Sequence, residues 1–526
     1  MTTIGYRQLW AADPGGWRAA GTAWAGLTVP VEGRVGELAG AAGRLRGGWS
    51  GAAATAADVR LAGLRGELTS VTPALIEVDQ VLAELAGRLT VAKARLAEAV
   101  ALADAAGLLV DRAGGVRADP SRVRPSERAG VAAAGVAAAL RDALDRAGTA
   151  DRAAADRLDE LSRAAASGWA SPPPPGRPAS DAPPAVVRAW WSGLTPAQRR
   201  WLVGHEPALV GRLDGVPVAA RDQANRLRLD AWREELLAER RRLLGRVPPG
   251  PAASVRLHGL AARLAGLDAL SGRLAAGDPR AYLLGLDPTG EGRVVVALGD
   301  PDHADRVLTY VPGMTAGLDD APGELDRAAR VLGRCAALAP GERSAAVLWL
   351  DYDAPDFLPE AASARQAHDA GPALHRFQEG LRASHEGPPA RQTVLGHSYG
   401  SLVVGVAARE HGLAADALVF VGSPGVGAPH AAELGLPPGQ VWASRAVDDV
   451  IRLAQPVDEL AGRALLGVSP LAAVLGRAGH ELWFGTDPAD HAFGGRVFPS
   501  GRGGHAGYWD PGNPALDGMA RIVLGR

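Results

Sequence analysis

The chain has 526 residues, and its 56 lysines and arginines nearly balance its 58 aspartates and glutamates, which leaves a formal net charge of -2 at pH 7. This balance excludes the overall positive field of nucleic-acid-binding proteins, so we expect no nucleic acid partner. The single cysteine, Cys335, excludes an internal disulfide and a cysteine-based metal site.

The length predicts more than one domain. The first residues, MTTIGYRQLWAADPGGW, lack the basic region and the apolar core of a signal peptide. No apolar run reaches the roughly 18 residues that a membrane-spanning helix needs. We therefore expect no integral membrane segment, and we favour a cytoplasmic location.

Residues 1–168 are rich in alanine, leucine, arginine and glutamate, which predicts a helical hairpin or coiled-coil domain. Leucines recur every seven residues, with smaller apolar residues at the intermediate positions of an a/d seam: Leu75, Leu82, Leu89 and Leu96, and Val78, Leu85, Ala92 and Ala99. This seam predicts that residues 72–106 pair with another helix, in this chain, in a helical protein partner or in a second copy. Thr72 and Pro73 predict that the helix begins, or kinks, at that point.

A glycine-rich turn at residues 47–51 separates two helical stretches of this region. Its Trp49-Ser50-Gly51 sequence resembles the turn of the WXG-type substrates of type VII secretion systems, in which Trp-x-Gly joins two long helices. The resemblance implies export by a type VII-like route as the alternative to a cytoplasmic location. Those systems usually read a Tyr-x-x-x-acidic signal after the second helix, and this sequence has no tyrosine between Tyr6 and Tyr282.

Residues 169–185 contain the stretch SPPPPGRPASDAPP. Proline removes backbone donors and fixes φ, so this segment predicts an extended linker. The following residues, 186–279, return to a helical pattern, with Trp190, Trp191 and Trp201 as aromatic anchors. We expect residues 186–526 to form the second domain, with 186–279 as its helical N-terminal extension.

Short apolar runs follow from about residue 280, and helical stretches separate most of the later ones. The runs predict strands at residues 282–287, 292–299, 306–313, 344–352, 392–398, 416–425 and 440–449. Continuous apolar strands that alternate with helices are typical of a mostly parallel sheet covered by helices on both faces. The predicted fold class is therefore α/β, preceded by an all-α domain.

The stretch TVLGHSYGSLVVG places Gly-His-Ser-Tyr-Gly between a predicted strand and a predicted helix. In a chain with 68 glycines the Gly-x-Ser-x-Gly pattern alone is weak, but the strand, turn and helix around it are typical of a nucleophile elbow. Ser398 is therefore the candidate nucleophile.

A nucleophilic serine needs a base, and the base needs an acid that orients it. In hydrolases with such an elbow the acid follows a late strand and the histidine lies near the C-terminus. Asp448 and Asp449 follow the strand at 440–446, and Asp449 fits better because an apolar pair follows it. His505, in a glycine-rich loop, is the candidate base. His491 is its main rival. His397, beside the serine, is expected either to contact the catalytic residues from behind the site or to line the pocket.

The oxyanion of a tetrahedral intermediate needs two donors. We expect the backbone N–H of Tyr399 to be one donor. The other is expected to be the N–H of Met314, in the loop TYVPGMTAG after the third strand. No phosphate-binding, dinucleotide-binding or metal-binding motif occurs, so no cofactor and no metal are expected.

From residue 186 onward the sequence resembles an actinobacterial α/β-hydrolase family that was formerly described as a domain of unknown function. The stretches that carry the resemblance include VPGMTAGLDD, VLGHSYGS, VGSPGVG and GHAGYWD. The resemblance implies the α/β-hydrolase fold, with Ser398 as nucleophile and His505 as base. Related sequences tend to have an Asp-Pro-Ile-like stretch where this one has Asp449-Val450-Ile451, so Asp448 stays the alternative acid.

These residues predict a serine esterase or lipase-like enzyme that cleaves a carboxylic ester or thioester of a small-molecule acyl substrate through an acyl-enzyme. Residues 421–435 followed by 453–479 are expected to form a cap that selects the acyl group. The alternative is a partner-binding helical protein, associated with type VII secretion, whose hydrolase domain is secondary or inactive.

Overall fold

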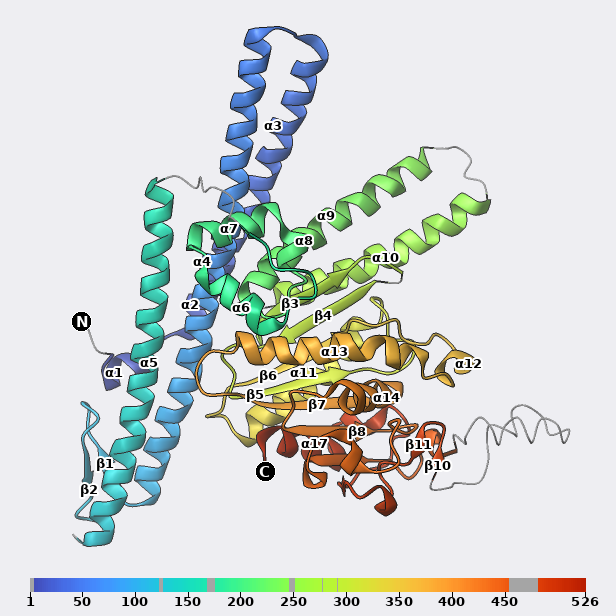
Figure 1. Cartoon of the computed structure of the whole chain (residues 1–526). Coiled ribbons are helices and arrows are strands. Elements are labelled where there is room, and N and C mark those ends of the chain that lie inside the picture. Colours follow the sequence, from blue (N-terminus) through green and yellow to red (C-terminus); the bar gives the residue numbers. More distant parts are fainter. Residues whose placement is uncertain are drawn as a thin grey trace, which may run out of the picture. The chain divides into compact units, whose positions relative to one another are not determined.

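The computed structural model describes residues 4–122, 126–167, 176–245, 251–276, 278–290, 292–453 and 481–526 (Figure 1). The chain divides into two compact units. The first contains residues 1–175 and 194–206, and the second contains residues 176–193 and 207–526.

The first unit is almost entirely helical. Its helices are α1 (Tyr6–Ala11), α2 (Pro14–Ala25), α3 (Thr28–Gly48), α4 (Ala52–Ala105), α5 (Glu127–Ser167) and α7 (Pro196–His205). Two short strands, β1 (Leu108–Val110) and β2 (Val116–Ala118), form an antiparallel hairpin that the sequence pattern did not predict. Trp49, Ser50 and Gly51 lie in the turn between α3 and α4, as expected, and Trp49 is 45% exposed.

The seam on α4 packs against α5 of the same chain. The two helices share one apolar core, formed on α4 by Val81, Leu85, Leu89, Ala92, Leu96, Ala99 and Ala103, and on α5 by Val136, Leu140, Ala143, Ala147, Ala150 and Ala154. This part of the predicted seam therefore packs against α5, whereas Leu75, Val78 and Leu82 lie outside this core. Of the two predictions for Thr72 and Pro73, the helix start is wrong, because α4 runs through Pro73, and the kink stays a prediction.

The second unit is built on a sheet with the order β12-β9-β8-β7-β5-β6-β4-β3. The strands are β3 (Ala281–Asp287), β4 (Arg293–Leu298), β5 (Arg306–Val311), β6 (Ser344–Leu350), β7 (Arg391–His397), β8 (Ala417–Val421), β9 (Val441–Ser444) and β12 (Arg496–Val497). β4 runs antiparallel to β3 and β6, and the other pairs are parallel. The seven predicted strands are all present. The sequence missed β12, because two residues show no periodicity.

Helices cover both faces of this sheet (Figure 1). α11 (Ala321–Leu338) and α17 (Pro514–Leu524) pack together against β5, β6 and β7, and α13 (Arg365–Ser384) and α14 (Tyr399–Val406) form the other layer. The remaining helices are α6 (Pro184–Gly193), α8 (Pro207–Val210), α9 (Val218–Leu244), α10 (Pro251–Ala275) and α12 (Leu358–Ala361). The predicted α/β fold class is confirmed.

Nearly every strand residue is buried, which explains why the strands are continuous apolar runs in the sequence. Two further strands, β10 (Glu481–Leu482) and β11 (Gly485–Thr486), form a small separate hairpin. Most of the second segment of the predicted cap, residues 454–479, lies outside the described residues. Among the helices that the structure describes, none combines the length and the apolar character required to cross a membrane.

Candidate active site

Ser398 lies in the tight turn between β7 and α14. Its backbone has φ 51° and ψ -129°, and only two non-glycine residues of the described chain have positive φ. Its side chain is largely covered, with 6% of the residue exposed. A left-handed backbone at a serine is strained, and such strain is typical of functional sites. The strand, turn and helix predicted around Ser398 are all present.

The two glycines of the motif are required by close packing around this turn. A Cβ atom on Gly396 would lie 2.6 Å from the carbonyl oxygen of Gly400, and one on Gly400 would lie 2.2 Å from the carbonyl oxygen of Val311. No side chain fits at these distances. The turn therefore presses directly against the end of β5, which leads into the loop with Met314.

Ser398, His505 and Asp449 form one hydrogen-bonded series. Nε2 of His505 lies 2.8 Å from Oγ of Ser398, and Nδ1 of His505 lies 2.9 Å from Oδ1 and 3.1 Å from Oδ2 of Asp449. Asp449 is fully buried, while 32% of the His505 side chain is exposed. The three residues that the sequence singled out for a catalytic triad thus meet with the geometry that such a triad requires.

Three donors hold the Asp449 carboxylate in its ionised form. Besides His505, the hydroxyl of Tyr508 donates to Oδ2 at 2.5 Å, and the N–H of Ile451 donates to Oδ1 at 2.9 Å. Burial by itself raises the pKa of Asp449, but the His505 contact and the other two hydrogen bonds outweigh it and lower the pKa below its ordinary value. Asp449 is therefore a buried anion beside the imidazole.

Asp448, the alternative acid, makes a different contact. Its carboxylate is exposed and accepts the backbone N–H of Gly503 at 3.2 Å. It thereby attaches the strand exit to the loop that holds His505, without touching the imidazole.

The ring of His397 packs against the imidazole of His505, with the ring centroids 4.8 Å apart. Nε2 of His397 lies 2.9 Å from the carbonyl oxygen of His505, and its ring packs edge-on against Trp509 with the centroids 4.9 Å apart. Burial, together with the charges of His505 and Arg327, lowers the pKa of His397 well below its usual value. A neutral His397 donates its Nε2–H to that carbonyl. It therefore contacts His505 from behind the site, which is one of the two roles that the sequence predicted for it.

The two predicted oxyanion donors flank Ser398. Tyr399 begins α14, and Met314 follows Gly313, on which a Cβ would lie 2.6 Å from Cβ of Ser398. Within the described residues, neither the N–H of Tyr399 nor that of Met314 has a backbone acceptor. Tyr352 fixes this loop, because its hydroxyl donates to the carbonyl oxygen of Pro312 at 2.7 Å.

Two tyrosines of this site were not predicted from the sequence. Tyr508 shares the stretch GHAGYWD with His505, which was a usable signal. Tyr352 follows β6, and nothing in its own stretch indicated that it reaches the loop after β5. His491, the rival base, lies exposed at the start of a short helix (His491–Phe493).

Comparison with known protein families matches the part of the chain that contains Ser398 and Asp449. A family model described as alpha/beta hydrolase matches residues 287–459. "Uncharacterized protein Rv2079" of Mycobacterium tuberculosis (strain ATCC 25618 / H37Rv) is 34% identical over 379 residues, which cover 67% of this chain and 56% of that protein. "Uncharacterized protein Mb0988c" of Mycobacterium bovis is 35% identical over 198 residues, which cover 36% of this chain and 73% of that protein. The chain thus spans little more than half the length of the first of these relatives.

Solved structures with a similar fold include esterase LipW from Mycobacterium marinum, at 16% identity and a TM-score of 0.28, covering 53% of this chain and 91% of that one. A putative thioesterase from Silicibacter sp. tm1040 is 13% identical with a TM-score of 0.27, covering 49% of this chain and 89% of that one. The family model and the similarity to the mycobacterial proteins show that the chain belongs to the α/β-hydrolase family.

Proposed function

We propose that this protein is a serine hydrolase that cleaves a carboxylic ester or thioester through an acyl-enzyme. The observation that carries the proposal is the hydrogen-bonded series from Ser398 through His505 to Asp449, built on a strained turn. Membership of the α/β-hydrolase family is consistent with it, although this fold also hosts other chemistries, so the argument depends on the site.

In this mechanism Nε2 of His505 takes the proton of Ser398 as Oγ attacks the acyl carbonyl carbon. Asp449 keeps the Nδ1–H of His505 pointed toward itself and stabilises the imidazolium that forms. The imidazolium then protonates the leaving alkoxide or thiolate, and the acyl group stays on Ser398. Water, deprotonated by His505, releases the acid and restores the serine.

The tetrahedral intermediates carry a negative oxygen that must be stabilised. The N–H groups of Tyr399 and Met314 are the proposed donors, because they lie on either side of Ser398 and have no backbone acceptor in the described chain. The N-terminus of α14 also favours negative charge at this point. Tyr352 contributes indirectly, since it fixes the loop that leads to Met314.

Labelling with a fluorophosphonate probe tests this proposal, because the probe reacts with activated serines. We expect an adduct on Ser398 in the wild-type chain, located by mass spectrometry, and none in Ser398→Ala or His505→Ala. Ser444→Ala is the matched control, since its hydroxyl is buried against the carbonyl of Phe498 and takes no part in the site. Failure of the folded wild-type protein to react would overturn the proposal.

The alternative, a partner-binding helical protein, has less support. The part of the α4 seam from Leu85 to Ala99 packs against α5 of the same chain. Export by a type VII-like route stays a prediction that depends on the Trp49-Ser50-Gly51 turn.

A further inference from the structure

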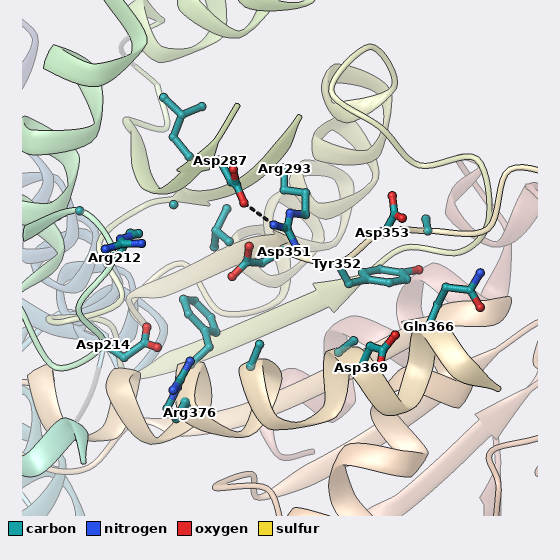
Figure 2. Close-up of a pocket in the computed structure, with 18 of the residues that line it drawn as sticks. Arg212, Asp214, Asp287, Arg293, Asp351, Tyr352, Asp353, Gln366, Asp369 and Arg376 are labelled. Atoms are coloured by element: carbon teal, nitrogen blue, oxygen red, sulfur yellow. Dashed lines mark hydrogen bonds and ion pairs between the residues drawn. The ribbon is translucent and has the colours of Figure 1, made fainter. Parts of the chain in front are cut away.

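A cavity of about 600 Å³ lies at the carboxyl ends of β3 and β6 (Figure 2). Its walls come from the segment before α9, the ends of β3 and β4, residues 351–356 after β6, and one side of α13. The carboxyl edge of a parallel sheet is the usual place for ligands in α/β proteins.

Charged groups dominate this cavity. Seven of the lining side chains are carboxylic acids and five are arginines, so carboxylates are in excess. Three of the arginines are neutralised within the wall, because Arg293 pairs with Asp287, Arg221 pairs with Asp214 at 2.8 Å, and Arg365 pairs with Asp369 at 3.6 Å. The negative excess thus remains with the other carboxylates.

Asp351 is the central carboxylate of the cavity. Figure 2 shows it between Asp214 on one side and the Asp287–Arg293 pair on the other. Its carboxylate makes no hydrogen bond or ion pair with any residue that the structure describes. Burial raises its pKa to about 6, against the opposing charges of Arg293 and Arg221. A charge without a partner in a partly buried place costs stability, and such costs are typical of binding sites.

The chemistry of the wall favours an organic cation over a metal ion. Among the described residues, the carboxylates of this cavity do not bring three oxygens close enough together to share one ion. A cavity of this volume instead holds a group the size of a small amine together with the chain that bears it. Phe377 and Tyr352, which also line the cavity, supply apolar surface for that chain.

The cavity and the proposed nucleophile lie on the same edge of the sheet. Leu348 on β6 and Leu395 on β7 are both in register with Tyr310 on β5, the strand between them. Asp351 and Ser398 follow those two leucines at equal separations along the chain. Two strand spacings therefore place Asp351 and Ser398 about 10 Å apart.

Hydrogen bonds also link the cavity wall to the proposed oxyanion donors. Tyr352 of the wall donates to the carbonyl of Pro312, and the N–H of Thr315 donates to the carbonyl of Pro355 at 2.8 Å. On the other side, the hydroxyl of Tyr399 donates to the carbonyl of Ser363 at 2.6 Å. A ligand in the cavity would thus lie against segments that are hydrogen-bonded to the loops around Ser398.

We propose that this cavity binds a primary ammonium group of the substrate, with Asp351 as its counterion. The inference rests on the proposed function, and it adds that the preferred acyl substrate carries its positive charge several carbon atoms from the scissile carbonyl. That spacing matches the separation between Asp351 and Ser398.

A matched pair of esters tests the selectivity. The p-nitrophenyl ester of ε-aminocaproic acid ends in an ammonium group where the ester of heptanoic acid ends in a methyl group. We expect wild-type kcat/KM to favour the amino ester about tenfold or more, the effect of one charged hydrogen bond. In Asp351→Asn that ratio should fall by about the same factor. Asp326→Asn, which removes an exposed carboxylate from α11 outside the cavity, should keep the wild-type ratio.

Direct binding separates this inference from the proposed function. Calorimetric titration of the full chain with n-hexylammonium, and with n-hexanol as neutral control, needs no turnover. We expect the ammonium to bind in the wild type and in Ser398→Ala, about tenfold more weakly in Asp351→Asn, and more tightly than the alcohol. Equal binding of the two probes to the wild type would overturn the inference, even if Asp351→Asn failed to fold. If the protein bound the ammonium in an Asp351-dependent way but the fluorophosphonate did not label it, only the proposed function would be overturned.

Discussion

The hydroxyl of Tyr508 donates a hydrogen bond of 2.5 Å to Oδ2 of Asp449, and the same hydroxyl accepts the backbone N–H of Ala446 at 3.0 Å. Ala446 lies just beyond β9, the strand that precedes Asp449. One aromatic side chain therefore attaches the carboxylate to the end of its own strand. Because Tyr508 closely follows His505 in the chain, the loop that supplies the imidazole also fixes the carboxylate that orients it.

Tyr508→Phe should lower kcat about tenfold, because it removes a charged hydrogen bond to the group that orients His505. It should also raise the pKa of Asp449, since one of the donors that lower that pKa is lost. A lowered carboxyl pKa contributes stability above about pH 4, and that stability is lost as the pH falls through the folded-state pKa. The stability difference between wild type and variant should therefore be present at neutral pH and shrink in acid.

Urea unfolding at neutral and acid pH, together with ester hydrolysis, measures both effects. A stability difference that stayed constant down to about pH 3 would show that Tyr508 acts only through packing. Unchanged kcat would show that Asp449 is held sufficiently by its other donors.

Replacing the two neighbouring aspartates should separate their roles. Asp449→Asn should reduce kcat by about a thousandfold or more, because an amide no longer holds the productive tautomer of His505. Asp448→Asn should cost tenfold at most, since its contact is an exposed one to the N–H of Gly503. The measurement is kcat of both variants with one p-nitrophenyl ester. A larger loss of kcat in Asp448→Asn than in Asp449→Asn would make Asp448 the acid.

The sequence contained most of the candidate site because each element of it is a local pattern. Ser398 lies between a strand run and a helix run, and Asp449 and His505 follow it in the order typical of such folds. Contacts between distant segments left no such pattern. Nothing near His397 indicates that its ring lies under the carbonyl of His505, and nothing near Asp351 indicates that its neighbours would already be paired.

Helix pairing shows the same limit. The spacing of Leu89 and Leu96 predicted a partner for α4 but not which one, and α5 has little leucine periodicity because alanines such as Ala143 and Ala147 form its side of the core. Small residues allow close helix approach, and they also occur throughout this alanine-rich region, so they carry little information on pairing.

His397 should act as a positioning residue for the loop with His505. His397→Phe keeps the ring beside Trp509 but removes the donor to the His505 carbonyl, so we expect kcat to fall about tenfold with KM nearly unchanged. His397→Gln, which offers an amide N–H, should recover part of that loss. A drop in kcat that Gln fails to rescue, with a lower melting temperature in both variants, would assign His397 to core packing alone.

Asp351 should make the fold less stable as it ionises. Its pKa is raised to about 6 chiefly by burial, with Arg293 and Arg221 opposing the rise and Asp214 and Asp287 adding to it. The unfolded chain holds this carboxyl near its ordinary pKa of 3.8, so the native state binds the proton more tightly. The cost of the charge is then fully present above about pH 6 and disappears below about pH 4.

Asp351→Asn should therefore melt at a higher temperature than the wild type at about pH 8, and the difference should vanish near pH 4. Adding n-hexylammonium should raise the melting temperature of the wild type at about pH 8, and less so below about pH 6, where protonation of Asp351 removes the counterion. Asp326→Asn, measured in parallel by circular dichroism, should follow the wild type at every pH. An Asp351→Asn variant that melted below the wild type at about pH 8 would mean that the protein itself supplies a partner for this carboxylate, which would leave no charge for an ammonium ligand to neutralise.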